Sequence, residues 1–120
     1  MKDSLAEGFE ASATYLVTDD MSPPHLPMKV LSTPSMIQLL EETCLKSIEQ
    51  FLDATETSVG THVNVSHSGA ASSGEEIEVK VKLTRIVKRR LTFETEVFSP
   101  RGVISEGSHE RAVVDTSRFG

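Results

Sequence analysis

The stretch that decides the fold is TPSMIQLLEETCLKSIEQFLD, residues 33–53. Thr33 followed by Pro34 is typical of a helix start, with threonine as the N-cap and proline at the first helical position. At about 100° per residue most apolar side chains fall on one face, and these are Ile37, Leu40, Cys44, Leu45, Ile48, Phe51 and Leu52. We therefore predict an amphipathic helix from Pro34 to about Asp53, with Leu39 facing away from the apolar stripe.

Period-two patterns predict one strand before this helix and four strands after it. A loop with three prolines separates the first strand from the helix. The predicted strands cover residues 11–18, 61–68, 76–87, 91–98 and 103–115. Their alternation of apolar and polar side chains indicates an antiparallel sheet with one buried face, and the residues that join the last four strands, among them Gly74, suit hairpins. We expect an α+β fold in which these four strands form a meander and the helix packs against the sheet.

The composition is that of a folded globular protein. A chain of 120 residues has the length of one ordinary domain, so we expect residues 1–120 to form a single domain. The formal net charge of −6 disfavours non-specific binding to nucleic acid, and no signal peptide or membrane span is evident. The single cysteine, Cys44, cannot form an internal disulfide, and its place on the apolar stripe favours a small apolar role. We expect a cytoplasmic protein without a nucleic-acid or membrane partner.

Motifs for metals and cofactors are not found in the sequence. The spacing of the four histidines, the cysteine and the acidic residues matches no zinc site. There is no Walker loop, Rossmann fingerprint or Gly-x-Ser-x-Gly elbow. We therefore expect neither a metal nor a cofactor.

Two ionisable residues lie on faces that the patterns predict to be apolar. Glu41 is four residues after Ile37 and four before Leu45, where burial of a carboxylate is costly. It is either an edge residue that reaches water or a basic partner, or a catalytic carboxylate. His67 continues the apolar face of the strand at 61–68. It is either a core-edge histidine satisfied by backbone groups, or the acid–base partner of Glu41.

Two further sites have a structural and a functional interpretation. Thr33 is either simply an N-cap, or a hydroxyl nucleophile or donor beside the free N–H groups of a helix start, which can stabilise an oxyanion. In the last strand, His109 and Arg111 share the face of Val103 and Val113. They belong either to a solvated charge ladder on an edge strand, or to a site in which Arg111 recognises a phosphate or carboxylate.

Several separate segments, in order, carry a family resemblance. They are VLSTPSMI (30–37), LEE (40–42), VGTHVNVSH (59–67), RRLTF (89–93) and GSHERAV (107–113). Together they resemble the fluoroacetyl-CoA thioesterase-like family of hotdog-fold thioesterases. The resemblance implies one long central helix wrapped by an antiparallel sheet. It also implies a homodimer with a continuous sheet and active sites at the dimer interface.

The resemblance also implies roles for individual residues. By the family's motif, Thr33, Glu41 and His67 would be the catalytic trio, while Gly60 would lie near the thioester and Arg111 would bind substrate. The implied reaction is hydrolysis of a small acyl thioester of coenzyme A or of a carrier protein, with Thr33 or an activated water as nucleophile. The alternatives are a non-catalytic hotdog module that binds acyl-CoA or a partner protein, and, less favoured by the matched segments, a hotdog dehydratase acting on acyl-carrier protein.

One segment departs from the family pattern. The fluoroacetyl-specific enzyme has a phenylalanine-bearing lid just before the helix, whereas Met21–Leu31 contains no phenylalanine. The resemblance therefore implies a related thioesterase and does not extend to selectivity for fluoroacetyl-CoA.

Overall fold

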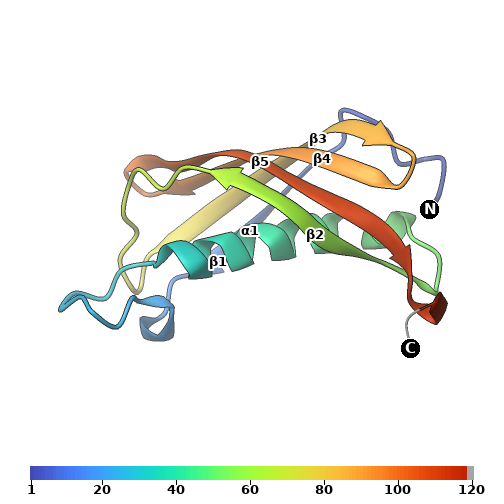
Figure 1. The fold of residues 1–120 in the computed structure, drawn as a ribbon. Coiled ribbons are helices and arrows are strands. Elements are labelled where there is room, and N and C mark those ends of the chain that lie inside the picture. The colour runs from blue at the N-terminus through green and yellow to red at the C-terminus, as the bar shows by residue number, and fades with distance from the viewer. Residues whose placement is uncertain (119–120) are drawn as a thin grey trace.

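The computed structural model describes residues 1–118, in which one long helix lies along one face of a five-stranded sheet (Figure 1). The elements in chain order are β1 (Glu10–Leu16), α1 (Thr33–Ile48), β2 (Glu56–Val65), β3 (Glu76–Val87), β4 (Arg90–Ser99) and β5 (Gly102–Asp115). Single turns of 3-10 helix span Asp19–Met21, Glu49–Phe51 and Thr116–Arg118. The predicted α+β arrangement is confirmed, and every predicted strand overlaps an observed one.

The order of strands in the sheet is β1-β3-β4-β5-β2, and all neighbouring pairs are antiparallel. β3, β4 and β5 form a meander as predicted, but β2 pairs with β5 at the far edge of the sheet. Residues 66–75 therefore pass from one edge of the meander to the other (Figure 1), and the hairpin predicted at Gly74 was wrong. A period-two pattern identifies a strand but carries no information about its partner.

The helix begins at a different cap from the one predicted. Ser32 is the N-cap, because its hydroxyl accepts a hydrogen bond from the Ser35 N–H at 3.2 Å, and Thr33 is the first helical residue. Serine and threonine are both good N-caps, so the sequence pattern did not separate the two. The helix also ends earlier than predicted, at Ile48, where the 3-10 turn begins.

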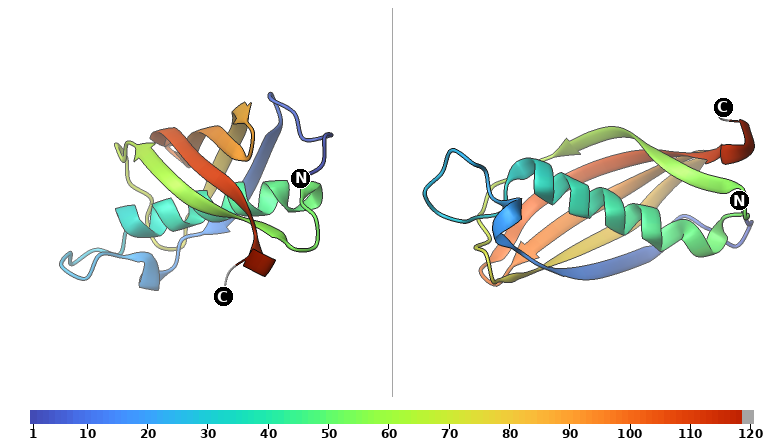
Figure 2. Two further views of the ribbon diagram at one scale, coloured as in Figure 1. Left: turned by 45° about the vertical axis from the view of Figure 1, so that its right-hand side comes forward. Right: turned by 90° about the horizontal axis from the view of Figure 1, so that it is seen from below.

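The buried face of α1 is rotated relative to the predicted stripe, because Ile37 and Leu45 are only half-buried. Its buried residues are Met36, Leu39, Leu40, Thr43, Cys44 and Ile48. Leu39 is only 8% exposed, so the side of the helix that faces away from the predicted stripe is covered as well. The reason is that the sheet curves around the helix (Figure 2), and Tyr15 of β1 reaches across to Thr43 with a 2.9 Å hydrogen bond. Glu41 consequently lies on the flank of the buried face rather than at its centre.

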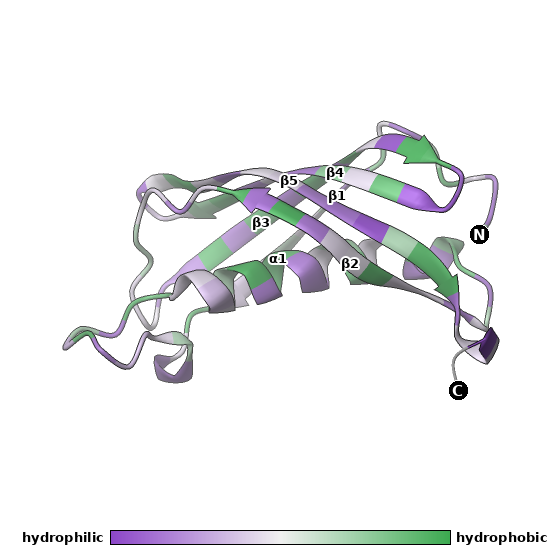
Figure 3. Cartoon of the chain, in the orientation of Figure 1, coloured by the Kyte–Doolittle hydropathy of each residue, from purple (hydrophilic) through white to green (hydrophobic). Residues whose placement is uncertain are grey.

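The core fills the space between α1 and the inner face of the sheet. Phe93 and Leu91 of β4 are 0% exposed and Ile77 of β3 is 1% exposed. Hydrophilic and hydrophobic residues alternate along the strands (Figure 3), as expected when one face of an antiparallel sheet is packed and the other is solvated. Among residues 1–118, no helix has both the length and the apolar character needed to cross a membrane.

Candidate active site

Thr33 and His67 meet at the start of α1. The Thr33 hydroxyl oxygen lies 2.7 Å from His67 Nδ1. His67 follows the end of β2, and the N–H groups of Ser66 and Ser68 on either side of it donate to β5 carbonyls at 2.9 and 2.8 Å. This pairing holds the segment alongside β5 and directs His67 at the first turn of the helix. Because Ser32 caps α1, the Thr33 hydroxyl is available to the imidazole, which is the arrangement in which histidine can take the proton of a nucleophile.

Glu41 faces β2 from the flank of α1. Its Oε2 lies 3.5 Å from Arg111 Nη1, and 39% of the Glu41 side chain is exposed, against 5% of the Arg111 side chain. A Cβ built on Gly60 would lie 2.8 Å from the same carboxylate oxygen, which is closer than Cβ atoms approach other heavy atoms in proteins. Glycine at position 60 therefore makes room for the carboxylate. Glu41 has the basic partner that one interpretation required, and it also stays open to a ligand.

Arg111 is held from three sides by β2 and β5. Its Nε donates to the Ser58 hydroxyl at 2.8 Å, its Nη2 donates to the Ser58 carbonyl at 3.0 Å, and its Nη1 lies 3.0 Å from His109 Nε2. His109 in turn lies with Nδ1 2.8 Å from the His62 carbonyl. Burial lowers the pKa of Arg111 and also lowers the pKa of His109. The predicted charge ladder on an edge strand was wrong, because β5 lies inside the sheet and both side chains are buried.

The predicted catalytic residues form two separate groups within one chain. Thr33 and Glu41 are eight residues apart on α1, which corresponds to about 12 Å along the helix axis. Within residues 1–118, no hydrogen bond joins Glu41 to Thr33 or to His67. The structure thus joins Thr33 to His67, and it separately joins Glu41 to Gly60 and Arg111.

Comparison with known proteins identifies the family. Residues 12–117 match the family described as fluoroacetyl-CoA-specific thioesterase, FlK. The chain belongs to the FlK family. The fluoroacetyl-CoA thioesterase of Streptantibioticus cattleyicolor is 27% identical over 128 residues, which cover 99% of this chain and 92% of that protein.

Solved structures of FlK confirm the hotdog fold for this family member. One structure of fluoroacetyl-CoA thioesterase FlK matches with a TM-score of 0.91 at 26% identity, covering 98% of this chain and 93% of that one. A mutant of FlK in complex with fluoroacetate and CoA matches with a TM-score of 0.90 at 26% identity, covering 97% of this chain and all of the other. The central helix and five-stranded antiparallel sheet described above are therefore those of a hotdog protein.

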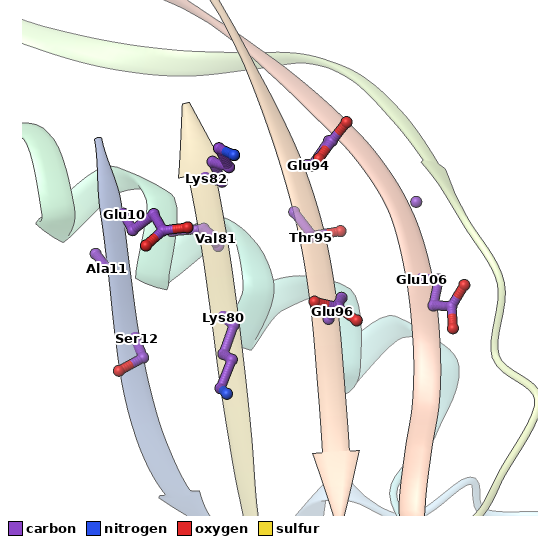
Figure 4. Close-up of a pocket in the computed structure, with 11 residues that line it drawn as sticks. Glu10, Ala11, Ser12, Lys80, Val81, Lys82, Glu94, Thr95, Glu96 and Glu106 are labelled. Atoms are coloured by element: carbon purple, nitrogen blue, oxygen red, sulfur yellow. The ribbon is translucent and has the colours of Figure 1, made fainter. Parts of the chain in front are cut away.

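A groove on the outer face of the sheet is unrelated to these residues. It has a volume of about 770 Å³, and Figure 4 shows its lining on the strands that lie in front of α1. Its lining includes Glu10, Lys80, Lys82, Glu94, Glu96 and Glu106. Lys80 pairs in register with Glu96, and Lys82 with Glu94, so opposite charges face each other across β3 and β4. The groove is a solvated face, on which the alternation of opposite charges between β3 and β4 favours this register.

Cys44 lies within electrostatic reach of Glu41 and Arg111. Cys44 is fully buried, and its burial raises the pKa of the thiol to about 12, so it stays protonated and acts as a small apolar residue. Among the described residues, no three histidine, cysteine or acidic side chains gather closely enough to hold a metal ion.

Ser58 is a site residue that the sequence analysis missed. It is 5% exposed and supplies two acceptors to Arg111. Little in the sequence indicated its role, because the strand was predicted to begin at residue 61, three residues after Ser58. It shares a strand face with Gly60, however, and an earlier strand start would have put the two residues together.

Proposed function

We propose that this FlK-family chain is an enzyme that hydrolyses a small acyl thioester of coenzyme A or of a carrier protein, at a site shared by two copies of the chain. The observation that carries the proposal is the 2.7 Å contact between the Thr33 hydroxyl and His67 Nδ1, in a chain whose family is described as thioesterases. The bound fluoroacetate and CoA of the FlK mutant support acyl-CoA as the substrate class.

A second copy would complete the site. Within the described chain β2 is an edge strand, and its Val59 and Val63 are 42% and 36% exposed. Unpaired edge strands readily pair with another chain. If two β2 edges pair antiparallel about a two-fold axis between residues 63 and 64, Gly60 of one copy lies opposite the partner's His67. Residue 37 lies midway between Thr33 and Glu41 on α1. If the two-fold axis also passes near residue 37, the two helices run antiparallel and Glu41 of one copy lies beside the Thr33–His67 pair of the other.

His67 and Glu41 would share the proton transfers. His67 Nδ1 accepts the proton of the Thr33 hydroxyl, or of a water that replaces it, as the nucleophile attacks the thioester carbonyl. Glu41 from the partner orients this water or the imidazole. The leaving thiolate then receives the proton from the imidazolium and departs as free thiol. Attack by water gives the carboxylic acid directly, whereas attack by Thr33 gives an acyl-threonine ester, which a water deprotonated by His67 then cleaves to the carboxylic acid and the free hydroxyl.

Gly60 is the oxyanion donor that the local geometry favours. Pro34 has no N–H, and the Ser35 N–H donates to the Ser32 hydroxyl, so the start of α1 offers few free donors. Gly60 lies beside Glu41 and next to the bulge between Gly60 and His62, where ladder hydrogen bonding is interrupted. We propose that its N–H stabilises the oxyanion.

Arg111 would act chiefly through Glu41. Its Nε, Nη1 and Nη2 all have protein partners, and the side chain is 5% exposed, which leaves little of it for a substrate. This modifies the expectation that Arg111 binds substrate directly: the buried cation holds the carboxylate at the edge of the site.

The segment Met21–Leu31, where the fluoroacetyl-specific enzyme has its lid, supports a substrate other than fluoroacetyl-CoA. Both of its ends are fixed, since the Ser32 N–H donates to the Met21 carbonyl at 2.8 Å and the Ser73 N–H donates to the Lys29 carbonyl at 3.0 Å. Between them, Leu26 and Met28 are 37% and 56% exposed, and the loop projects beyond the start of α1 (Figure 2). Because Leu26 and Met28 are not aromatic, we expect this segment to accept small acyl groups other than fluoroacetyl.

A thiol-release assay tests the proposal against a panel of acyl-CoAs that are short, long, aromatic and halogenated. We expect turnover on at least one short acyl-CoA, and we expect Glu41→Gln and His67→Ala each to lower kcat on the order of 100-fold or more without unfolding the protein. Absence of turnover on the whole panel, together with tight acyl-CoA binding, would instead identify a non-catalytic binding module. Unchanged activity in both variants would refute the assigned site.

A further inference from the structure

His109 is a buried histidine for which the proposed reaction has no direct use. It is 0% exposed, lies on β5, and is separated from solvent by the elements that surround it. Its two ring nitrogens each have one partner: Nδ1 lies 2.8 Å from the His62 carbonyl, and Nε2 lies 3.0 Å from Arg111 Nη1. The first contact joins β5 to β2, the strand that carries Gly60, and the second joins two residues of β5.

The partners of His109 determine its protonation. A backbone carbonyl can only accept, so Nδ1 carries a proton, and a guanidinium can only donate, so Nε2 offers its lone pair. His109 is therefore the neutral Nδ1–H tautomer, which agrees with the lowering of its pKa by burial. An imidazolium would point an N–H at the N–H of Arg111 and is disfavoured by the adjacent cation.

The Nη1 group of Arg111 is shared between His109 and Glu41. Ser58 fixes the Nε and Nη2 side of the guanidinium, and Nη1 lies 3.0 Å from His109 Nε2 but 3.5 Å from Glu41 Oε2. His109 is thus the nearer acceptor, and the arginine holds the carboxylate by a long contact only. A Cβ on Gly60 would lie 3.2 Å from His109 Cε1 and 2.8 Å from Glu41 Oε2, so glycine, imidazole and carboxylate lie close together.

We infer that His109 is a positioning residue: it accepts one N–H of Arg111 Nη1 and so fixes the guanidinium, whose second Nη1 N–H holds the Glu41 carboxylate beside Gly60, where it can act on the substrate. This inference rests on the proposed thioesterase function. Without the imidazole acceptor, one N–H of the buried Nη1 has no partner, so the guanidinium shifts and the carboxylate leaves its working position with it.

Kinetics of three variants test the inference. His109→Leu removes the acceptor at similar volume, His109→Gln supplies an amide oxygen in its place, and Arg111→Met removes the group to be positioned. On the best acyl-CoA of the panel, we expect His109→Leu to lower kcat by about tenfold or more with little change in KM, because small displacements of a catalytic group are costly. His109→Gln should recover kcat to within about threefold of the unaltered protein, and His109→Leu should have almost no further effect in the Arg111→Met background.

The inference would be overturned if well-folded His109→Leu and His109→Gln lost kcat equally. It would also be overturned if His109→Leu lowered kcat by the same factor in the unaltered protein and in Arg111→Met. Thermal melting and light scattering of each variant distinguish misfolding from mispositioning.

A measurement independent of activity separates this inference from the proposed function. Side-chain ¹⁵N NMR at neutral pH should show His109 as the Nδ1–H tautomer, and the Arg111 guanidinium protons should exchange slowly in the unaltered protein and in His109→Gln but quickly in His109→Leu. An Nε2–H tautomer or an imidazolium would overturn the inference. If the protein hydrolyses no thioester while the NMR result holds, the proposed function fails and the contact between His109 and Arg111 stands.

Discussion

At the scale of single residues, Gly60 shows how the absence of a side chain can make a site. The space that a Cβ would fill is occupied by the Glu41 carboxylate, with its Oε2 only 2.8 Å from the Cβ position. The same position is 3.2 Å from the His109 ring, so a Cβ there would crowd both neighbours. The group of Gly60, Glu41 and His109 therefore depends on a hydrogen atom at position 60.

Replacing this glycine should damage activity more than stability. In Gly60→Ala the new methyl group displaces the partly exposed Glu41 carboxylate, which can swing toward solvent, so we expect kcat to fall on the order of 100-fold while the melting temperature changes by only a few degrees. Thr61→Ala, at the exposed bulge residue beside it, is the matched control. Full activity in Gly60→Ala would show that the position of the carboxylate is not critical.

At the scale of elements, the pairing of β2 with β5 decides which residues meet. This pairing sets Gly60 opposite Arg111 and Val63 opposite His109, and it carries His67 to the start of α1. Gly107 of β5 faces the β2 backbone, and a Cβ there would lie 2.1 Å from the Asn64 carbonyl oxygen and 2.6 Å from Val65 Cα. Unlike the contact at Gly60, these neighbours are backbone atoms that cannot swing aside.

Gly107→Ala should therefore act on the fold as well as the site. The methyl group must push β2 away from β5, and we expect a loss of about 3 kcal/mol in the free energy of unfolding. Urea denaturation measures this loss, with Ser108→Ala on the same strand as control. A loss no larger than that of the control would mean that the two strands separate locally at little cost.

One of the contacts that hold the connection from β2 to β3 is an ion pair with a predictable pH dependence. Both oxygens of Glu75 accept from Arg101, at 2.7 and 2.8 Å, and the Ser72 N–H donates at 2.6 Å. The hydrogen bonds from Arg101, followed by that from Ser72, lower the pKa of Glu75 from 4.5 to about 2. Because the folded-state pKa is depressed, the stabilisation is complete above the ordinary glutamate pKa and is lost as the pH falls toward 2.

Glu75→Gln tests this dependence. We expect the variant to melt a few degrees below the unaltered protein at pH 7, and we expect the difference to shrink between about pH 4.5 and pH 2. Glu76→Gln, exposed at the start of β3, is the control for the loss of one negative charge. A difference that stayed constant down to pH 2 would assign the effect to packing rather than to the ion pair.

At the scale of the whole molecule, the fold followed from the sequence more fully than the site did. Helix and strand periodicities identified α1 and all five strands but none of the 3-10 turns, since a periodicity can be recognised only over several residues. The pairing of β2 with β5, and with it the contact of Arg111 with Ser58, depends on residues more than 40 positions apart in the sequence, which no local pattern records. The helix cap was ambiguous because Ser32 and Thr33 are chemically alike, and the centre of the buried face was misplaced because the curved sheet covers Met36, Leu39 and Thr43 more fully than Ile37 and Leu45.

The residues of the candidate site were predicted more fully than the contacts between them. Thr33 and His67 were singled out separately, and the structure brings them into contact. Glu41 had two interpretations, and within one chain it contacts Arg111, a basic partner of the kind that the first interpretation named. The separation of about 12 Å along α1 is fixed by helix geometry, and it leads to the central claim that Glu41 serves the site of the neighbouring copy.

Subunit complementation tests this claim most directly. Glu41→Gln and His67→Ala chains, each inactive alone, are mixed, unfolded and refolded together, and thiol release from the best acyl-CoA is measured. In a shared site, every mixed dimer has one intact site, so we predict recovery of about a quarter of the activity of the unaltered protein after random pairing. If mixed dimers form but no activity returns, all three residues act within one chain and the shared-site account is wrong.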